Sequence, residues 1–150
     1  MSLENDLNQK TFRNEYQKGV INLIYTYNWL NEKMKSFFEK EDITSQQFNI
    51  LRILRGAGVP ISTLQIRERM LDKMSDTSRI VDRLVLKGLA KENICKNDKR
   101  LVDVSISTKG QKLLEKIDAY ESKMDAIIGN LSQAEAKTLN NLLDKIRNSD

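Results

Sequence analysis

A short run of the chain carries hydroxyl and guanidinium side chains at a spacing that suits contact with a polyanion. Ser75, Thr77 and Ser78 can hydrogen-bond phosphates or the edges of bases. Arg79 can form paired hydrogen bonds with guanine. If residues 75–87 form a helix, its N-terminal amides also favour phosphate. The chemistry expected of this segment is therefore the binding of double-stranded DNA.

Charged residues around this run have more than one interpretation. Arg83 can contact DNA or pair with Asp82 at the protein surface, and both options stay open. Lys73 and Lys99 are expected to bind phosphates without regard to sequence. Asp76 would repel a phosphate, so it is interpreted as a helix-start residue that the helix dipole stabilises, with recognition of cytosine as the alternative.

Local signals predict a β-hairpin directly after this helix. Gly88 is expected to end the helix over 75–87. Residues 89–95 and 101–106 are predicted strands, the second of which alternates polar and apolar side chains. The tip over 96–100 is polar, basic and rich in the Asn/Asp chemistry of turns. A basic hairpin behind such a helix can hold DNA by two grooves at once.

Further helix starts are marked by capping boxes, in which a hydroxyl accepts a backbone amide and the residue three positions later reaches back. The four pairs are Thr44 with Gln47, Ser62 with Gln65, Thr108 with Gln111, and Ser132 with Glu135. They predict helices over 44–55 and 62–70. The order of helix, helix, recognition helix and two-stranded wing predicts a winged helix-turn-helix module over residues 44–106, in a fold that is mainly α with a small β-hairpin wing.

Apolar stripes at both ends of the chain predict helices outside that module. Apolar residues recur every three or four positions over 5–40 and over 108–148, with a break at Gly129-Asn130. A first helix of roughly 34 residues, from 5 to 38, would span about 50 Å, which exceeds the width of a compact globule of this size. We therefore expect 5–40 and 108–148 to be dimerisation helices, with a closed monomeric bundle as the alternative.

The positive charge of the chain is concentrated on the candidate DNA-binding segment. The formal net charge is +4, from 25 basic and 21 acidic residues. Residues 66–100 hold ten of the basic and six of the acidic residues, and the remainder of the chain holds 15 of each. Local positive potential supplies the sequence-independent part of DNA affinity. Charge alone also leaves open a solvated, lysine-rich surface.

Absent residue types exclude several classes of site. The chain has no histidine and one cysteine, so histidine metal sites, Ser-His-Asp triads and Cys-His pairs cannot form. Nothing else assembles a reaction centre, so we expect no enzyme activity, no metal and no cofactor.

The lone Cys95 is expected to be a plain thiol in a reducing cytoplasm. No apolar run approaches the roughly 20 residues of a membrane helix, so a single cytoplasmic domain over 1–150 without a membrane partner is expected.

Two motifs resemble the MarR family of bacterial transcription regulators, and the resemblance extends over nearly the whole chain. Residues 78–89 match the family's recognition helix and its exit, which ends in Lys-Gly-Leu. The run Asp98-Lys99-Arg100, followed by 104–110, matches the wing pattern of Asp-x-Arg and then a strand leading into Thr-x-Gly. The two motifs stand in the family's order and spacing.

The resemblance implies a homodimer bound to a near-palindromic operator. Its recognition helices, over 75–87, would enter successive major grooves, and the wing over 96–100 would enter a flanking minor groove. Arg100 would reach into that minor groove, because a narrow minor groove attracts arginine. Asp98 would orient Arg100, with an ordinary surface ion pair as the alternative.

The family also implies a small-molecule effector, often an aromatic acid, bound between the dimerisation helices and the winged module. The candidate pocket residues are Tyr25, Trp29, Arg52 and Arg55, each of which also suits the core or the surface. The predicted function is a ligand-responsive transcription regulator, most simply a repressor. A winged helix that binds a protein instead of DNA is the alternative.

Overall fold

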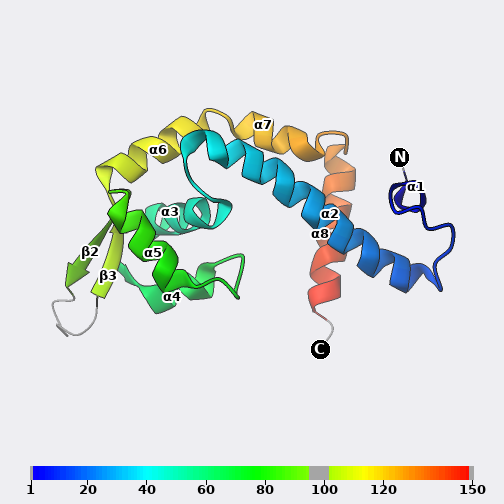
Figure 1. Ribbon diagram of the computed structural model, residues 1–150, viewed down its shortest axis with the longest axis horizontal. Coiled ribbons are helices and arrows are strands. Elements are labelled where there is room, and N and C mark those ends of the chain that lie inside the picture. The colour runs from blue at the N-terminus through cyan, green and yellow to red at the C-terminus, as the bar shows by residue number, and fades with distance from the viewer. Residues whose placement is uncertain (1, 95–101, 149–150) are drawn as a thin grey trace.

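The computed structural model describes residues 2–94 and 102–148 and is mostly helical. In chain order its elements are α1 (Leu3–Asp6), α2 (Glu15–Phe38), η1 (Glu39–Glu41), α3 (Ser45–Ala57), β1 (Ile61–Ser62), α4 (Thr63–Arg69), α5 (Thr77–Leu86), β2 (Ala90–Ile94), β3 (Val102–Ile106), α6 (Thr108–Asp118), α7 (Glu121–Asp125), η2 (Ala126–Ile128) and α8 (Gln133–Arg147). Figure 1 shows α3, α4, α5 and the strands gathered at one end of the molecule, with α1, α2 and α8 extending toward the other. Helices α6 and α7 run along the edge between the two ends (Figure 1).

A three-stranded antiparallel sheet, in the order β1-β3-β2, forms the base of the wing. Ile61 in β1 lies opposite Val104 in β3, and Ala90 in β2 lies opposite Ile106 in β3. The sequence pattern predicted β2 and β3 only, because the two residues of β1 are too few to show an alternation. Side chains from both helices and sheet fill one core, and the largest fully buried ones are Phe38, Ile50, Leu51, Leu54, Ile66, Leu84, Val104, Leu114 and Ile117.

Most predicted helix starts are confirmed, and one is wrong. Capping boxes are present at Thr44, Ser62 and Ser132. The box predicted at Thr108 does not form, because Ser107 is the N-cap of α6. Its hydroxyl accepts the amide of Gly110 at 3.0 Å and donates to the carbonyl of Gly88 at 2.6 Å. A tertiary hydrogen bond thus decides between two adjacent hydroxyl residues that both suit the cap.

The predicted first helix over 5–38 is wrong in its N-terminal third. Helix α2 begins only at Glu15, where Asn14 caps it by accepting the amide of Gln17 at 2.9 Å. Asn8 lies in the turn that follows α1, where its φ of 51° ends the helical conformation. Asparagine side chains compete with the helix for backbone hydrogen bonds, which explains the break. The 24 residues of α2 span about 36 Å instead of the predicted 50 Å.

The C-terminal helices break at the predicted glycine and also at a place that the sequence did not indicate. Between α7 with its 3-10 extension and α8, the chain turns over residues 129–132. A second break over 119–120 separates α6 from α7. Because the apolar stripe continues across this second break, periodicity alone gave no sign of it.

The two long terminal helices keep much of their apolar surface exposed. In α2 only Phe38 is buried, and no described residue of α8 is buried. The exposed large apolar side chains on these helices include Tyr16, Val20, Leu23, Ile24, Tyr27 and Trp29 on α2, with Leu139 and Leu142 on α8. Exposed apolar faces of this extent mark interaction surfaces. Among the described helices, none combines the length and the apolar character that crossing a lipid bilayer requires.

Candidate nucleic-acid interface and ligand cavity

Helix α5 has one side in the core and one side in solvent. Val81 and Leu84 are buried and Ile80 and Val85 pack against the core, as the helical spacing of the sequence requires, whereas Leu86 at the end of the helix is exposed. Ser78, Arg79 and Arg83 are exposed on the opposite side. Within the described residues neither arginine forms an ion pair, so the alternative pairing of Arg83 with Asp82 is not present. Two guanidinium groups therefore project freely from one helix face.

The start of α5 differs from the prediction in two details. Asp76 is the N-cap and accepts the amide of Arg79 at 3.2 Å, which confirms Asp76 as a helix-start residue, and the helix begins at Thr77 instead of the predicted Ser75. Thr77, whose hydroxyl was predicted to be available to phosphates or base edges, does not lie on the exposed face. Thr77 is only 4% exposed because it lies one turn before the buried Val81, on the same side of the helix. Its Oγ1 has no hydrogen-bond partner among the described residues.

The loop between α4 and α5 is held by hydrogen bonds from its own side chains and from α3. Asp72 accepts the Ser75 hydroxyl at 2.7 Å and the Met74 amide at 3.0 Å, and these bonds lower the pKa of its carboxyl. The Leu71 amide donates to Asn49 Oδ1 at 3.0 Å. Leu71 and Met74 nevertheless remain 88% and 93% exposed, beside the start of α5. This exposed pair was not predicted, although two apolar residues in a polar turn were the available signal.

The other predicted DNA contacts lie around this helix or outside the described residues. Lys73 is exposed, and its Nζ donates to the carbonyl of Glu68 near the end of α4. Four residues singled out in the sequence lie outside the described residues: Cys95, Asp98, Lys99 and Arg100. The strands that flank this segment pair with each other, with Ile94 opposite Val102.

An ion pair joins α3 of the winged module to α6. Arg55 donates from both terminal nitrogens to the two carboxylate oxygens of Asp118, at 2.6 and 3.1 Å. This bidentate contact lowers the pKa of the Asp118 carboxyl and raises the pKa of the Arg55 guanidinium, because each charge stabilises the other. A second ion pair, between Lys116 and Glu41 at 2.8 Å, ties α6 to η1. Helix α6 is thereby fixed to both neighbours.

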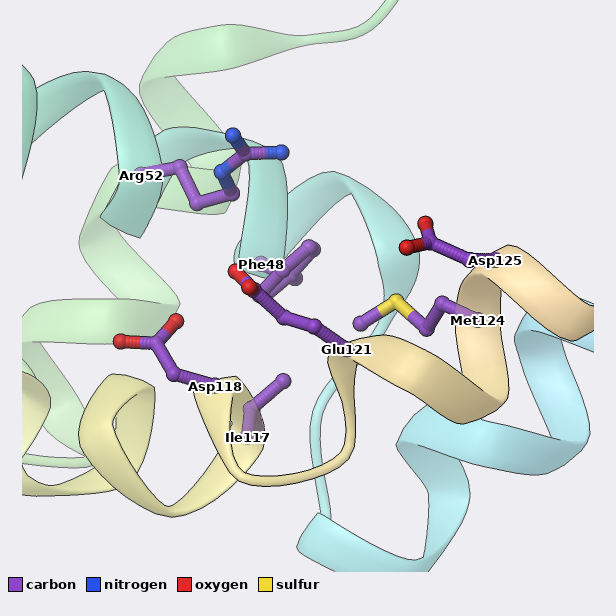
Figure 2. Close-up of a pocket in the computed structure, with 7 residues that line it drawn as sticks. All are labelled: Phe48, Arg52, Ile117, Asp118, Glu121, Met124 and Asp125. Carbon is purple, nitrogen blue, oxygen red and sulfur yellow. The ribbon is translucent and has the colours of Figure 1, made fainter. Parts of the chain in front are cut away.

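A cavity of about 260 Å³ lies beside the α3–α6 ion pair. Figure 2 shows the side chains that line it: Phe48 and Arg52 from α3, Ile117 and Asp118 from α6, and Glu121, Met124 and Asp125 from α7. Of the four predicted pocket residues only Arg52 lines this cavity. Arg55 is engaged by Asp118, and Tyr25 and Trp29 line a separate cavity of about 420 Å³ between α1 and α2. The structure does not bring all four residues to one cavity, because Tyr25 and Trp29 face α1.

The known proteins that this chain resembles share one family name. No model of a protein family matches the chain. The multiple antibiotic resistance protein MarR of Salmonella typhimurium is 29% identical over 127 residues, which cover 83% of this chain and 88% of MarR. A crystal structure of a mutant MarR from E. coli, complexed with operator DNA, gives a TM-score of 0.76 at 25% identity and covers 97% of this chain and 99% of that one. In sequence and in fold the chain is similar to the MarR transcription regulators.

A more distant structure shares the MarR fold. The organohalide-sensing transcriptional regulator crystallised with 2,4-dichlorophenol gives a TM-score of 0.81 at 17% identity, and the match covers 90% of this chain and 80% of that one. At this level of identity the match concerns the fold alone. Two sequences with little identity therefore adopt the same arrangement of winged module and flanking helices.

Two short MarR-family patterns in this chain meet in space and have structural roles. In the Lys-Gly-Leu pattern, Gly88 ends α5 with a φ of 70°, a left-handed conformation that favours glycine. In the Thr-x-Gly pattern, a Cβ at Gly110 would lie 2.2 Å from the Leu89 carbonyl oxygen. The Lys109 ammonium also donates to the Lys87 carbonyl at 2.9 Å. The two patterns together join α5, β2 and the start of α6.

Proposed function

We propose that the chain is a homodimeric, sequence-specific DNA-binding transcription regulator, which acts as a repressor controlled by a small molecule. The observation that carries the proposal is the exposed face of α5. Ser78, Arg79 and Arg83 project from it, and neither guanidinium is in an ion pair within the described residues. A helix of this kind fits the major groove, where Arg79 pairs with guanine and the Ser78 hydroxyl binds phosphate.

The wing contributes a second DNA contact in this proposal. Arg100 enters the minor groove beside the site of α5, Asp98 orients it, and Lys99 and Lys73 bind phosphates. These assignments rest on the sequence pattern and on the local excess of positive charge. The operator-bound MarR from E. coli, 25% identical, supports a DNA-binding role for the whole module.

Dimerisation through the terminal regions, 5–40 and 108–148, completes the proposal. The apolar side chains of α2 and α8 that lie exposed in one chain are buried when two chains pair. A two-fold dimer places its recognition helices about one helical turn of DNA apart, which requires a near-palindromic operator. In this proposal the protein works in the cytoplasm with the chromosome and regulates transcription without catalysing a reaction.

Effector control is assigned to the cavity between α3, α6 and α7, which lies beside the contact of the winged module with the terminal helices. A ligand there changes DNA affinity only if it binds two arrangements of the recognition helices unequally. The organohalide-sensing regulator, which binds 2,4-dichlorophenol, shows that this fold accommodates a small aromatic molecule.

The proposal is tested by selecting genomic fragments that the protein binds and then titrating the enriched site by fluorescence anisotropy at several salt concentrations. We expect a near-palindrome whose affinity falls steeply with salt, because several phosphates release counterions at once. Arg79→Ala is expected to weaken the enriched site about tenfold or more, the value of one bidentate base contact. Lys137→Ala, which removes an exposed charge on α8, is the control, and sedimentation verifies that both variants remain dimers.

A protein-binding winged helix is the second candidate, and the exposed Leu71 and Met74 favour it. Exposed apolar side chains beside the N-terminus of α5 can contact a protein surface as well as the edge of a base. Arg100→Ala separates the candidates. Loss of DNA affinity in an intact dimer supports the regulator, whereas no enriched fragment and no salt-dependent affinity in the wild type support the protein-binding module.

A further inference from the structure

The cavity beside the Arg55–Asp118 ion pair has an apolar floor. Phe48, Ile117 and Met124 supply an aromatic ring, a branched aliphatic chain and a thioether, which suit contact with another ring. Its volume of about 260 Å³ lies just below the roughly 300–1,000 Å³ typical of ligand sites. The occupant that fits is therefore a single-ring molecule.

The charge around this floor is predominantly negative. Asp118 is neutralised by Arg55, and Glu121 and Asp125 form no ion pair within the described residues. Arg52 is the one remaining cation of the lining, and its guanidinium carbon lies 5.8 Å from the centre of the Phe48 ring. In Figure 2, Arg52 stands on one rim and the carboxylates stand on α6 and α7 across from it. With Arg55 included, three carboxylates face two guanidinium groups.

This excess of negative charge disfavours the binding of an acid, which is an anion at neutral pH, and favours the binding of a base, which is a cation. A bound aromatic carboxylate would place its charge near Glu121 and Asp125, and like charges at short range repel. An ammonium group would pair with the same two carboxylates, while the ring of its carrier rests on Phe48. We propose that the cavity binds a compact aromatic ammonium compound and, resting on the proposed function, that such cations are the effector class of this regulator.

The test uses three probes with the same ring and different charge: benzylamine as its ammonium ion, benzyl alcohol and benzoate. Each is titrated at neutral pH into the full chain without DNA, and the ¹H–¹³C methyl signal of Met124 is followed by NMR. The chain has five methionines, and Met124→Leu identifies the signal. We expect benzylammonium to shift it saturably, and to bind about tenfold more tightly than benzoate, with the alcohol between them.

Charge-removing variants of nearly unchanged shape locate the effect. Glu121→Gln and Asp125→Asn are exposed on α7, so neither disturbs the core. Each is expected to weaken benzylammonium about threefold, the value of one partly exposed ion pair. Glu115→Gln, on α6 outside the cavity, is the matched control and is expected to leave the affinity unchanged.

Three outcomes would overturn the assignment: benzoate binding as tightly as benzylammonium, no shift of Met124 with any probe, or equal affinities in all three charge variants and the wild type. None of these would affect the proposed DNA-binding function, because the titration contains no DNA. Conversely, cation binding in a protein that enriches no operator would leave the cavity assignment standing and would contradict only its role as an effector site.

Discussion

The hydroxyl of Thr77 is buried without a hydrogen-bond partner among the described residues. It lies at the first position of α5, one turn before Val81, where the methyl group of threonine packs inward with its neighbours. A buried donor that forms no hydrogen bond loses its interaction with water and gains nothing in return. Thr77 is therefore a packing residue of the recognition helix, whereas Ser78 next to it remains available to a ligand.

Thr77→Val is expected to stabilise the protein by about 1 kcal/mol, because valine has the same shape and no unsatisfied hydroxyl. Urea unfolding at a fixed protein concentration measures the change. The DNA affinity of this variant should equal that of the wild type, while Ser78→Ala should weaken it. A loss of DNA affinity in Thr77→Val at unchanged stability would return Thr77 to the DNA interface.

At the scale of elements, the start of α6 packs closely against the residues that end α5. Gly110 lies so close to the backbone that a Cβ would stand 2.2 Å from the Leu89 carbonyl oxygen and 2.9 Å from an Ile106 side-chain carbon. Neither the Leu89 carbonyl nor the sheet that follows it can move without a substantial cost in free energy. The Ser107 hydroxyl holds the same contact from the other side through the Gly88 carbonyl.

Gly110→Ala should destabilise the fold by about 3 kcal/mol, the cost of strong overpacking against a rigid neighbour. Gly56→Ala is the matched control. Gly56 lies inside α3, and a Cβ there would meet no side chain and no other element within 4 Å, so alanine should stabilise the helix by about 0.5–1 kcal/mol. Unfolding free energies that change equally in the two variants would contradict the steric account of Gly110.

Local signals were sufficient to predict some elements and insufficient for others. The caps at Thr44 and Ser62 follow from residues within one turn, so the sequence predicted them correctly. The cap at Ser107 depends on the Gly88 carbonyl, which is distant in sequence, and no local pattern distinguishes it from Thr108. The same limit applies to the cavity. Glu121 joins it because the chain breaks before α7, and the uninterrupted apolar stripe conceals that break.

At the scale of the whole molecule, the Arg55–Asp118 ion pair connects the winged module to the helices that lead to α8. The side chains of both residues are about one-third exposed, at 29% and 37%, so water weakens the attraction. The bidentate geometry gives this contact a defined orientation, in addition to the core packing that α3 and α6 share. Part of the stability of this contact therefore depends on the charge of the Asp118 carboxylate.

Asp118→Asn is expected to lower stability by about 1 kcal/mol at neutral pH, the upper end for ion pairs that water reaches. Because Arg55 lowers the pKa of Asp118 in the folded chain below its ordinary 3.8, the contribution is complete above that value and is lost as the pH falls through the folded pKa. The difference between wild type and variant should thus shrink below about pH 4. Thermal unfolding from pH 7 to pH 2 measures it, with Asp125→Asn as the control.

The junction of Gly88, Leu89 and Gly110 has a consequence for how related sequences diverge. The glycines that make the family patterns recognisable satisfy backbone geometry and touch no groove-facing side chain of α5. The positions that hold the scaffold are therefore different from Ser78 and Arg79, which the proposed function assigns to the target site. Under that proposal, exchanging Ser78 and Arg79 would change the promoters that the protein binds and would leave the two glycine patterns intact, so the patterns alone would not identify those promoters.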